Sequence, residues 1–154
     1  MYQKINTNIN NKINNILKGE YEISTLGTID KNSFPFVSKI IPMFENNILY
    51  ILISDLSEHT QNINMNDKVS FYFSLKEKSK TKSNNPRLTI TGNIKKLSID
   101  KDSNEFIKLL NSYQEIEKGS KMWGKFSDFN FYEFNPVRAL YIEGFGKAYQ
   151  KKYY

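Results

Sequence analysis

Residues 48–63 read ILYILISDLSEHTQNI, and their pattern of apolar and polar residues predicts the centre of the fold. It begins with six consecutive apolar residues, Ile48 to Ile53, a pattern typical of a strand that is buried on both faces in the centre of a sheet. The chain then runs directly into a helix start, where Ser57 is a typical N-cap residue. We expect this helix to continue to about residue 65, with Ile63 turned inward. The stretch therefore predicts a central strand that leads into a short helix.

Further strands are predicted on both sides of this stretch by alternating apolar residues. They cover residues 21–29, 34–43, 69–75, 87–97, 129–134 and 139–145. Residues 30–33 and 46–47 have the composition of turns between them. Pro35 and Pro42 favour a strand end, an edge or a bulge, and Gly92 favours a bulge. The strands are short and follow one another closely, which indicates a mostly antiparallel arrangement.

Two amphipathic helices are predicted outside the strands. The first carries an apolar stripe that ends before Gly19 and consists of Ile5, Ile9, Ile13, Ile16 and Leu17. The second spans residues 100–113, with Phe106, Leu109, Leu110 and Tyr113 on one face. Antiparallel strands with three peripheral helices predict an α+β domain built on a closed or partly closed barrel, because closure removes exposed strand edges.

The composition excludes several classes of site and location. The chain has 154 residues, the size of one domain, and its lack of Cys excludes disulfides, thiolate nucleophiles and cysteine metal sites. Its one histidine, His59, excludes a His-rich metal centre. No apolar run is long enough for a membrane span, and residues 1–17 lack the apolar core of a secretory signal. We therefore expect a soluble, cytoplasmic protein without a membrane partner.

The net charge of +6 has a simple explanation in surface lysines. The densest basic run, residues 76–82, alternates Lys with polar residues and has the composition of a solvated loop. Charge alone is weak evidence for nucleic acid, and no RNA-binding motif accompanies it. A nucleic-acid partner is therefore not expected.

Several polar residues lie close together in sequence where the predicted central strand meets the helix. Free backbone N–H groups and the positive end of the helix dipole favour an anion there, and Ser54, Ser57 and Thr60 could add hydroxyl donors. The alternative is that Ser57 only caps the helix and that His59 is an exposed residue of its first turn. Ser, Asp and His are close in sequence here, but proximity in sequence does not make a catalytic triad.

Arg87 is unusual because the chain carries 20 Lys and only two Arg. A guanidinium group can hold a carboxylate or phosphate through two parallel hydrogen bonds, whereas a structural ion pair is the alternative role. Gly144 and Gly146 form a lone GxG without a following helix, so they do not make a dinucleotide-binding fingerprint.

Four blocks of this sequence resemble the pyridoxamine-phosphate-oxidase-like FMN-binding split-barrel superfamily, and within it the HugZ/HutZ-type haem-utilisation proteins. The blocks are FPFVSKIIP at 34–42, LISDLSEHTQNI at 52–63, PRLTITG at 86–92 and FYEFNPVRALYIEGFGKA at 131–148. The resemblance implies an antiparallel Greek-key split β-barrel of about six to seven strands with peripheral helices. It also implies a homodimer with a flavin or haem site at the subunit interface.

The resemblance divides residues 1–154, taken as one split-barrel domain, into three parts. We expect an N-terminal helix in residues 1–19, the barrel in residues 20–148 and a tail in residues 149–154. Haem oxygenases of this branch are expected to carry an axial His in the tail. This tail has none, and its Tyr residues either ligate ferric iron or are simply packed or disordered.

The resemblance also implies the cofactor-binding residues. Ser38 and Lys39 would face the cofactor, Arg87 would approach it, and the pocket for a phosphate or propionate would comprise Ser54, Ser57, His59, Thr60 and Asn62. Flavin oxidases of the superfamily carry cations where this chain has Ser38, Glu58 and His59. The replacement of cations by Ser38 and Glu58 weakens the attraction for a dianionic phosphate. The pattern SDLSEHT is shared with the haem-utilisation branch and favours it.

Three functions follow from these observations. The favoured one is a haem-binding protein that could also degrade haem. An FMN-binding oxidoreductase is the alternative, and a non-catalytic binding module is the third. Haem or FMN is therefore the expected cofactor, with no catalytic residue assigned and no dedicated metal site.

Overall fold

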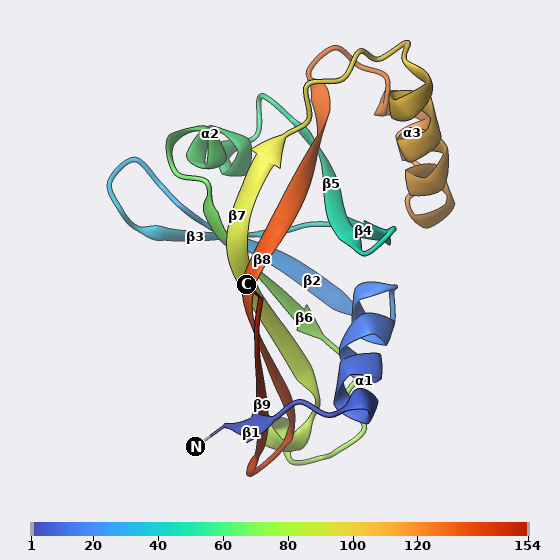
Figure 1. Ribbon diagram of the computed structural model, residues 1–154. Helices are drawn as coiled ribbons and strands as arrows, with labels where there is room; N and C mark the ends of the chain where they lie inside the picture. Colours follow the sequence, from blue (N-terminus) through green and yellow to red (C-terminus); the bar gives the residue numbers. More distant parts are fainter. Residues whose placement is uncertain (1, 154) are drawn as a thin grey trace.

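The computed structural model describes residues 2–153, which form one nine-stranded sheet with flanking helices (Figure 1). The strands are β1 (Gln3–Lys4), β2 (Ile23–Ile29), β3 (Pro35–Lys39), β4 (Pro42–Glu45), β5 (Ile48–Ser54), β6 (Lys68–Ser74), β7 (Arg87–Lys96), β8 (Phe129–Gly144) and β9 (Lys147–Lys152). The helices are α1 (Thr7–Leu17), α2 (Glu58–Met65), α3 (Asn104–Ile116) and α4 (Ser120–Trp123), with a 3-10 turn η1 (Lys82–Asn84). Each helix within residues 2–153 is too short or too polar to span a membrane.

The sheet is antiparallel except where β1 runs parallel to β9. Its main path is β1-β9-β8-β7-β6-β2-β3, and β5 joins β4 to β8. The expected α+β class, a mostly antiparallel barrel with peripheral helices, is confirmed. Partners on both edges of β5 also confirm its predicted central position.

The strand expected at residues 34–43 is in fact two strands. β3 pairs with β2, whereas β4 pairs with β5, and Ile40 and Ile41 lie between them. Pro42 has no N–H to donate, which interrupts the ladder at this point. The Ile40 N–H donates to the Ser24 carbonyl at 3.2 Å, and the chain then bends from one part of the barrel to the other. This bend places Lys39, Ile40 and Ile41 beside the end of β5.

The last two predicted strands are a single long strand. β8 pairs with β7 along its length, with β5 through its first half and with β9 through its second half. Pro136 does not end the strand. The register with β7 shifts between Thr91 and Gly92, and this bulge accommodates the proline, which lacks an N–H. The predicted bulge at Gly92 is confirmed.

Most of the segment expected to be a tail, residues 149–154, belongs to the sheet. Residues 147–152 form β9 and cover an edge of β8 that would otherwise be unpaired. Tyr149 and Tyr153 pack against the core, and the ring centroids of Tyr149 and Tyr141 lie 6.2 Å apart. Tyr149 and Tyr153 are therefore packed, whereas Tyr154 lies outside the described residues.

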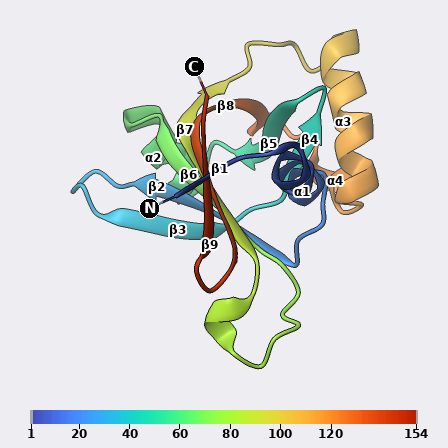
Figure 2. The same cartoon turned by 60° about the horizontal axis from the view of Figure 1, so that its bottom comes forward.

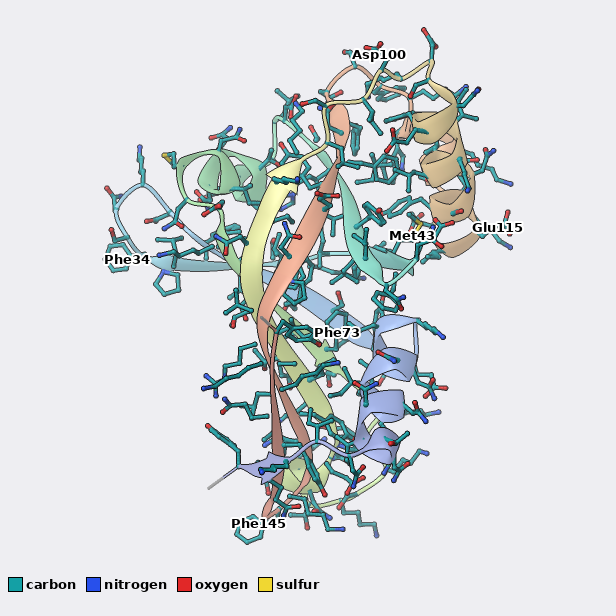
Figure 3. All side chains as sticks on the ribbon, viewed as in Figure 1. Phe34, Met43, Phe73, Asp100, Glu115 and Phe145 are labelled. Carbon is teal, nitrogen blue, oxygen red and sulfur yellow. The ribbon has the colours of Figure 1, made fainter. Side chains whose placement is uncertain are left out.

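Two apolar clusters hold the helices on the sheet. The larger fills the barrel beneath α1, whereas the smaller joins α3 to the outer side of β4, β5 and β8. Figure 2 shows α3 beside β4. β5 serves both, since Ile51 and Ile53 belong to the first cluster and Leu52 to the second. Met43 points from β4 toward α3, and Phe73 lies in the barrel (Figure 3). α3 begins and ends about one turn later than expected, and α4 was not predicted.

Candidate functional site

An open pocket of about 310 Å³ lies between the β3–β4 bend, the end of β5 and the start of α2, with α3 and α4 beyond. Its apolar lining consists of Ile40, Ile41, Leu52, Ile53, Tyr113, Trp123 and Phe129. Its polar lining consists of Lys39, Ser54, Ser57 and His59, all of which are among the residues expected to bind a cofactor. The fold therefore gathers half of the predicted site residues around one pocket.

His59 is the most distinctive polar group of this pocket. Its Nδ1 lies 3.2 Å from the Ser38 hydroxyl, so the two predicted residues contact each other across α2 and β3. Its Nε2 is buried and has no hydrogen-bond partner among residues 2–153. A buried polar atom without a partner lowers the stability of the fold, and a ligand group that forms a hydrogen bond with it removes this cost. His59 is thus oriented on one side and unsatisfied on the other.

Burial lowers the pKa of His59 below its ordinary value of 6.5. The imidazole is therefore neutral at pH 7. A neutral imidazole held through one ring nitrogen can present the other as a hydrogen-bond donor or, in the other tautomer, as a metal ligand. Both uses suit a site for an anion or for a metal-bearing ring.

The N-terminus of α2 opens beside His59. Ser57 occupies the N-cap position, as expected, but in the described chain its hydroxyl makes no capping hydrogen bond. The side-chain cap predicted at Ser57 is therefore not formed. The first N–H groups of a helix lack partners within the helix and carry the positive end of its dipole. This end of α2 can accept a negative group.

Ser54 and its neighbours hold the loop that precedes α2. The Ser54 hydroxyl donates to the Asp128 carboxylate and accepts the Leu56 N–H at 3.1 Å. The Asp55 N–H donates to the Asp128 carbonyl at 2.8 Å, and Lys96 contacts both Asp55 carboxylate oxygens at 3.2 Å. Ser54 is therefore engaged within the protein, although it lines the pocket.

Thr60 and Asn62 lie beneath the helix and do not line the pocket. The fully buried Thr60 hydroxyl donates to the Ser54 carbonyl at 2.7 Å. The buried Asn62 amide donates to the Thr28 hydroxyl at 3.0 Å. Both side chains dock α2 on the barrel and so position His59.

Arg87 lies at the other end of the sheet. It starts β7, whereas the Lys96 that contacts the α2 loop ends it, a separation of roughly 30 Å at about 3.3 Å per residue (Figure 1). Its Nη1 donates to the carbonyls of Ser83 and Asn85, each at 3.0 Å, which holds the loop around η1. One copy of the chain does not bring Arg87 to His59, and within residues 2–153 Arg87 forms no ion pair.

Comparison with protein families identifies this architecture. The family model described as "CREG, beta-barrel" matches residues 18–153, which is most of the chain. The chain belongs to the CREG β-barrel family. No curated protein matches the chain. The expected pyridoxamine-phosphate-oxidase-like split barrel is thereby confirmed as the fold.

Solved structures with the same fold include three with similar barrels. Campylobacter jejuni ChuZ is 21% identical with a TM-score of 0.84, and the match covers 97% of this chain and 61% of that one. A haem-binding protein from Mycobacterium smegmatis is 16% identical with a TM-score of 0.77, over 89% of this chain and 56% of that one. HutZ, the haem storage protein from Vibrio cholerae, is 22% identical with a TM-score of 0.66, over 82% and 88%. This CREG β-barrel chain thus spans less than two thirds of the length of ChuZ and of the Mycobacterium smegmatis protein.

The aromatic wall of the pocket in this CREG β-barrel chain was not foreseen from the sequence. The rings of Trp123 and Phe129 lie 4.6 Å apart at 38°, and Tyr113 packs edge-on against Trp123. The Tyr113 hydroxyl donates to the Ile41 carbonyl at 3.0 Å and so ties α3 to the β3–β4 bend. The helical stripe did predict that Tyr113 points inward. The inward position of Trp123 could not be predicted in this way, because α4 is a single turn and too short to show a helical period.

The lowered pKa of His59 predicts how stability depends on pH. Between the folded pKa and the unfolded value of about 6.5, the unfolded chain binds a proton more readily than the folded one. The free energy of unfolding should therefore fall as the pH decreases through about 6.5. The variant His59→Gln lacks this contribution but keeps a polar side chain near Ser38. In urea unfolding at about pH 7.5 and about pH 5.5, we expect the wild type to lose more stability than the variant. Equal losses would contradict a buried, neutral His59.

Proposed function

We propose that this chain binds haem in the pocket beside His59, and that FMN is the second candidate ligand. The observation that supports this proposal concerns His59, which lines a pocket with an aromatic wall and whose buried Nε2 has no partner among residues 2–153. The pocket offers an apolar surface for a planar ring, a neutral imidazole and a free helix end for a carboxylate. Two solved neighbours are described as haem-binding or haem-storing, which is consistent with this ligand.

The charges around the pocket favour haem over FMN. Among residues 2–153, Lys39 is the one cation that lines it, and the exposed Glu58 places a negative charge in the first turn of α2. A flavin phosphate carries close to two negative charges on one group, whereas the two propionates of haem carry one charge each on separate side chains, so each needs less compensation. FMN remains the second candidate because the fold is shared with the pyridoxamine-phosphate-oxidase-like proteins.

The residues fit a bound ring in distinct roles. Haem would supply a redox-active iron in a planar apolar macrocycle. His59 would meet it through Nε2, while Ser38 holds the opposite ring nitrogen. Trp123 and Phe129 would cover apolar surface and exclude water.

We also propose that a second copy of the chain completes the site. The outer face of β2, β3, β6 and β7 carries mainly small and apolar side chains: Ile23, Thr25, Gly27, Val37, Ser70, Tyr72, Thr89 and Thr91. Val37 is 65% exposed, and a hollow of about 530 Å³ lies over Gly27, Ser70 and Thr91. The same face also carries Lys39, Lys68 and Arg87. An uncovered face with mainly small and apolar side chains is typical of an interface between copies.

Such a dimer would give Arg87 a role at the site. Arg87 belongs to this outer face, because its cross-strand partner Ser74 is itself opposite Ile23. A two-fold axis in the plane of the face and perpendicular to the strands would bring the Arg87 end of one copy to the α2 end of the other. The two parts of the predicted site would then meet across the interface.

Mixing two defective variants tests this arrangement. His59→Ala and Arg87→Ala should each bind haemin weakly, and light scattering should give twice the 18.1 kDa mass of one chain for both. After subunit exchange, half of the dimers are mixed, and each mixed dimer regains one intact site, so about a quarter of the sites should recover. Melting curves of both variants control for folding. No recovery on mixing, or a monomeric mass, would contradict the shared site.

The ligand itself is tested by titration of the wild-type protein with haemin and, separately, with FMN, followed by visible absorption. We expect saturable binding of haemin with a shifted Soret band and weaker binding of FMN. Tighter FMN binding would replace haem by flavin as the ligand. If neither binds, the proposed function is wrong.

A further inference from the structure

A second cavity, of about 290 Å³, lies between α1 and the inner side of the barrel, next to the β4–β5 turn and the end of β9. It shares no lining residue with the pocket beside His59 among residues 2–153. Its apolar floor consists of Leu17, Phe44, Leu49, Ile90, Phe134 and Pro136. Asn10, Asn14 and Asn47 form part of its rim. The cavity is thus apolar inside and polar at the mouth, as small-molecule sites usually are.

Lys151 places a positive charge in this cavity. In the sheet it stands opposite Ala139, which stands opposite Ile90, so the three side chains share one face. Ala139 and Ile90 are buried, which shows that Lys151 points inward. Its ammonium group donates to the Asn10 side-chain oxygen at 2.7 Å and lies 4.8 Å from the centre of the Tyr153 ring.

The partners of Lys151 are neutral. Among residues 2–153 no carboxylate lies within ion-pair distance of it, and Glu143, on the neighbouring strand, is paired with Lys12 and Lys147. Burial raises the pKa of Tyr153, so its phenol also stays uncharged. An ammonium group directed into an apolar cavity without a counterion in this part of the chain favours a ligand that brings one negative charge.

We propose that this cavity binds a small apolar monocarboxylate, such as an aromatic acid. The carboxylate would lie against Lys151 and the rim asparagines, and the apolar body would contact the floor. The volume is at the lower end of the range for small-molecule pockets, which suits a single ring. This proposal stands independently of haem or flavin binding, because the two cavities are separate.

The test compares benzoate with benzamide, which has nearly the same shape and no charge. By calorimetry we expect saturable benzoate binding and about tenfold weaker benzamide binding, as for the loss of one charge-assisted hydrogen bond. Lys151→Met should weaken benzoate by about tenfold and leave benzamide unchanged. Lys152→Met is the matched control, because Lys152 is exposed and stands opposite Arg138 on the other face; it should bind like the wild type.

Two further measurements keep the test decisive if Lys151→Met does not fold. Asn14→Phe, at the half-buried rim, should obstruct the mouth and weaken both ligands. Benzoate should also bind equally well in the presence of saturating haemin or FMN. The proposal is overturned if benzoate does not bind at millimolar concentrations or if benzamide binds with the same affinity as benzoate. It is also overturned if neither cavity variant lowers the affinity for benzoate. Competition between benzoate and haemin would place benzoate in the other pocket and would also overturn it.

Discussion

Replacing Gly92 by Ala is expected to lower the free energy of unfolding by about 3 kcal/mol or more, a loss typical of severe overpacking. A Cβ at this position would lie 2.1 Å from the Asn135 carbonyl oxygen and 2.9 Å from the Phe134 ring. Because the first contact is with backbone, no side-chain movement relieves it, and β7 must separate from β8. These strands form the longest ladder of the sheet and include the bulge that accommodates Pro136.

Gly146→Ala is the matched control for this prediction. Gly146 has a φ of +76° in the turn between β8 and β9, and a Cβ added there would meet no atom of residues 2–153 within 4 Å apart from Gly146 itself and its two chain neighbours. The substitution should cost only the backbone penalty of about 1 kcal/mol. Urea unfolding of both variants measures the difference. A loss for Gly92→Ala no larger than that for Gly146→Ala would show that the close approach is not required.

His59→Ala is expected to weaken haemin binding by about tenfold or more. The variant removes the imidazole that lines the pocket, with its buried Nε2, and this corresponds to the loss of at least one charge-assisted hydrogen bond to a propionate, or of an iron ligand. Ser38→Ala should have a smaller effect in the same direction, because Ser38 only holds the opposite ring nitrogen at 3.2 Å.

Gln61→Ala is the control for the His59 variant, since Gln61 is exposed on the same helix and does not line this pocket. It should bind haemin like the wild type, and melting curves should confirm that all three variants are folded. Unchanged affinity in His59→Ala would remove His59 from the site.

Local patterns predicted most of this fold. The double-faced apolar run at residues 48–53 correctly indicated a central strand, and the stripe of α1 correctly indicated its buried side. The failures occurred where tertiary pairing overrides local signals. Pro136 resembles a strand break in sequence, but the bulge at Gly92 allows β8 to continue through it. Residues 149–152 resemble a polar tail, but the free edge of β8 recruits them as a strand.

The candidate site was predictable in its location and less so in its details. The strand–helix junction identified Ser57 and His59, which line the pocket, whereas Thr60 and Asn62 turned out to be buried beneath α2. A spacing pattern cannot distinguish a hydroxyl that faces a ligand from one, like that of Thr60, that donates a hydrogen bond to the carbonyl of Ser54, six residues earlier. The wall formed by Trp123 and Phe129 depends on contacts between distant segments, which no local pattern encodes.

The most direct test of ligand binding beside His59 is an NMR measurement of its imidazole signals before and after addition of haemin or FMN. The chain has one histidine, so these signals are assigned without ambiguity. We predict that the ligand that binds shifts or broadens the His59 ring signals and that their titration with pH is suppressed in the complex. Ring signals that stay unchanged while either ligand is bound would contradict binding at this site.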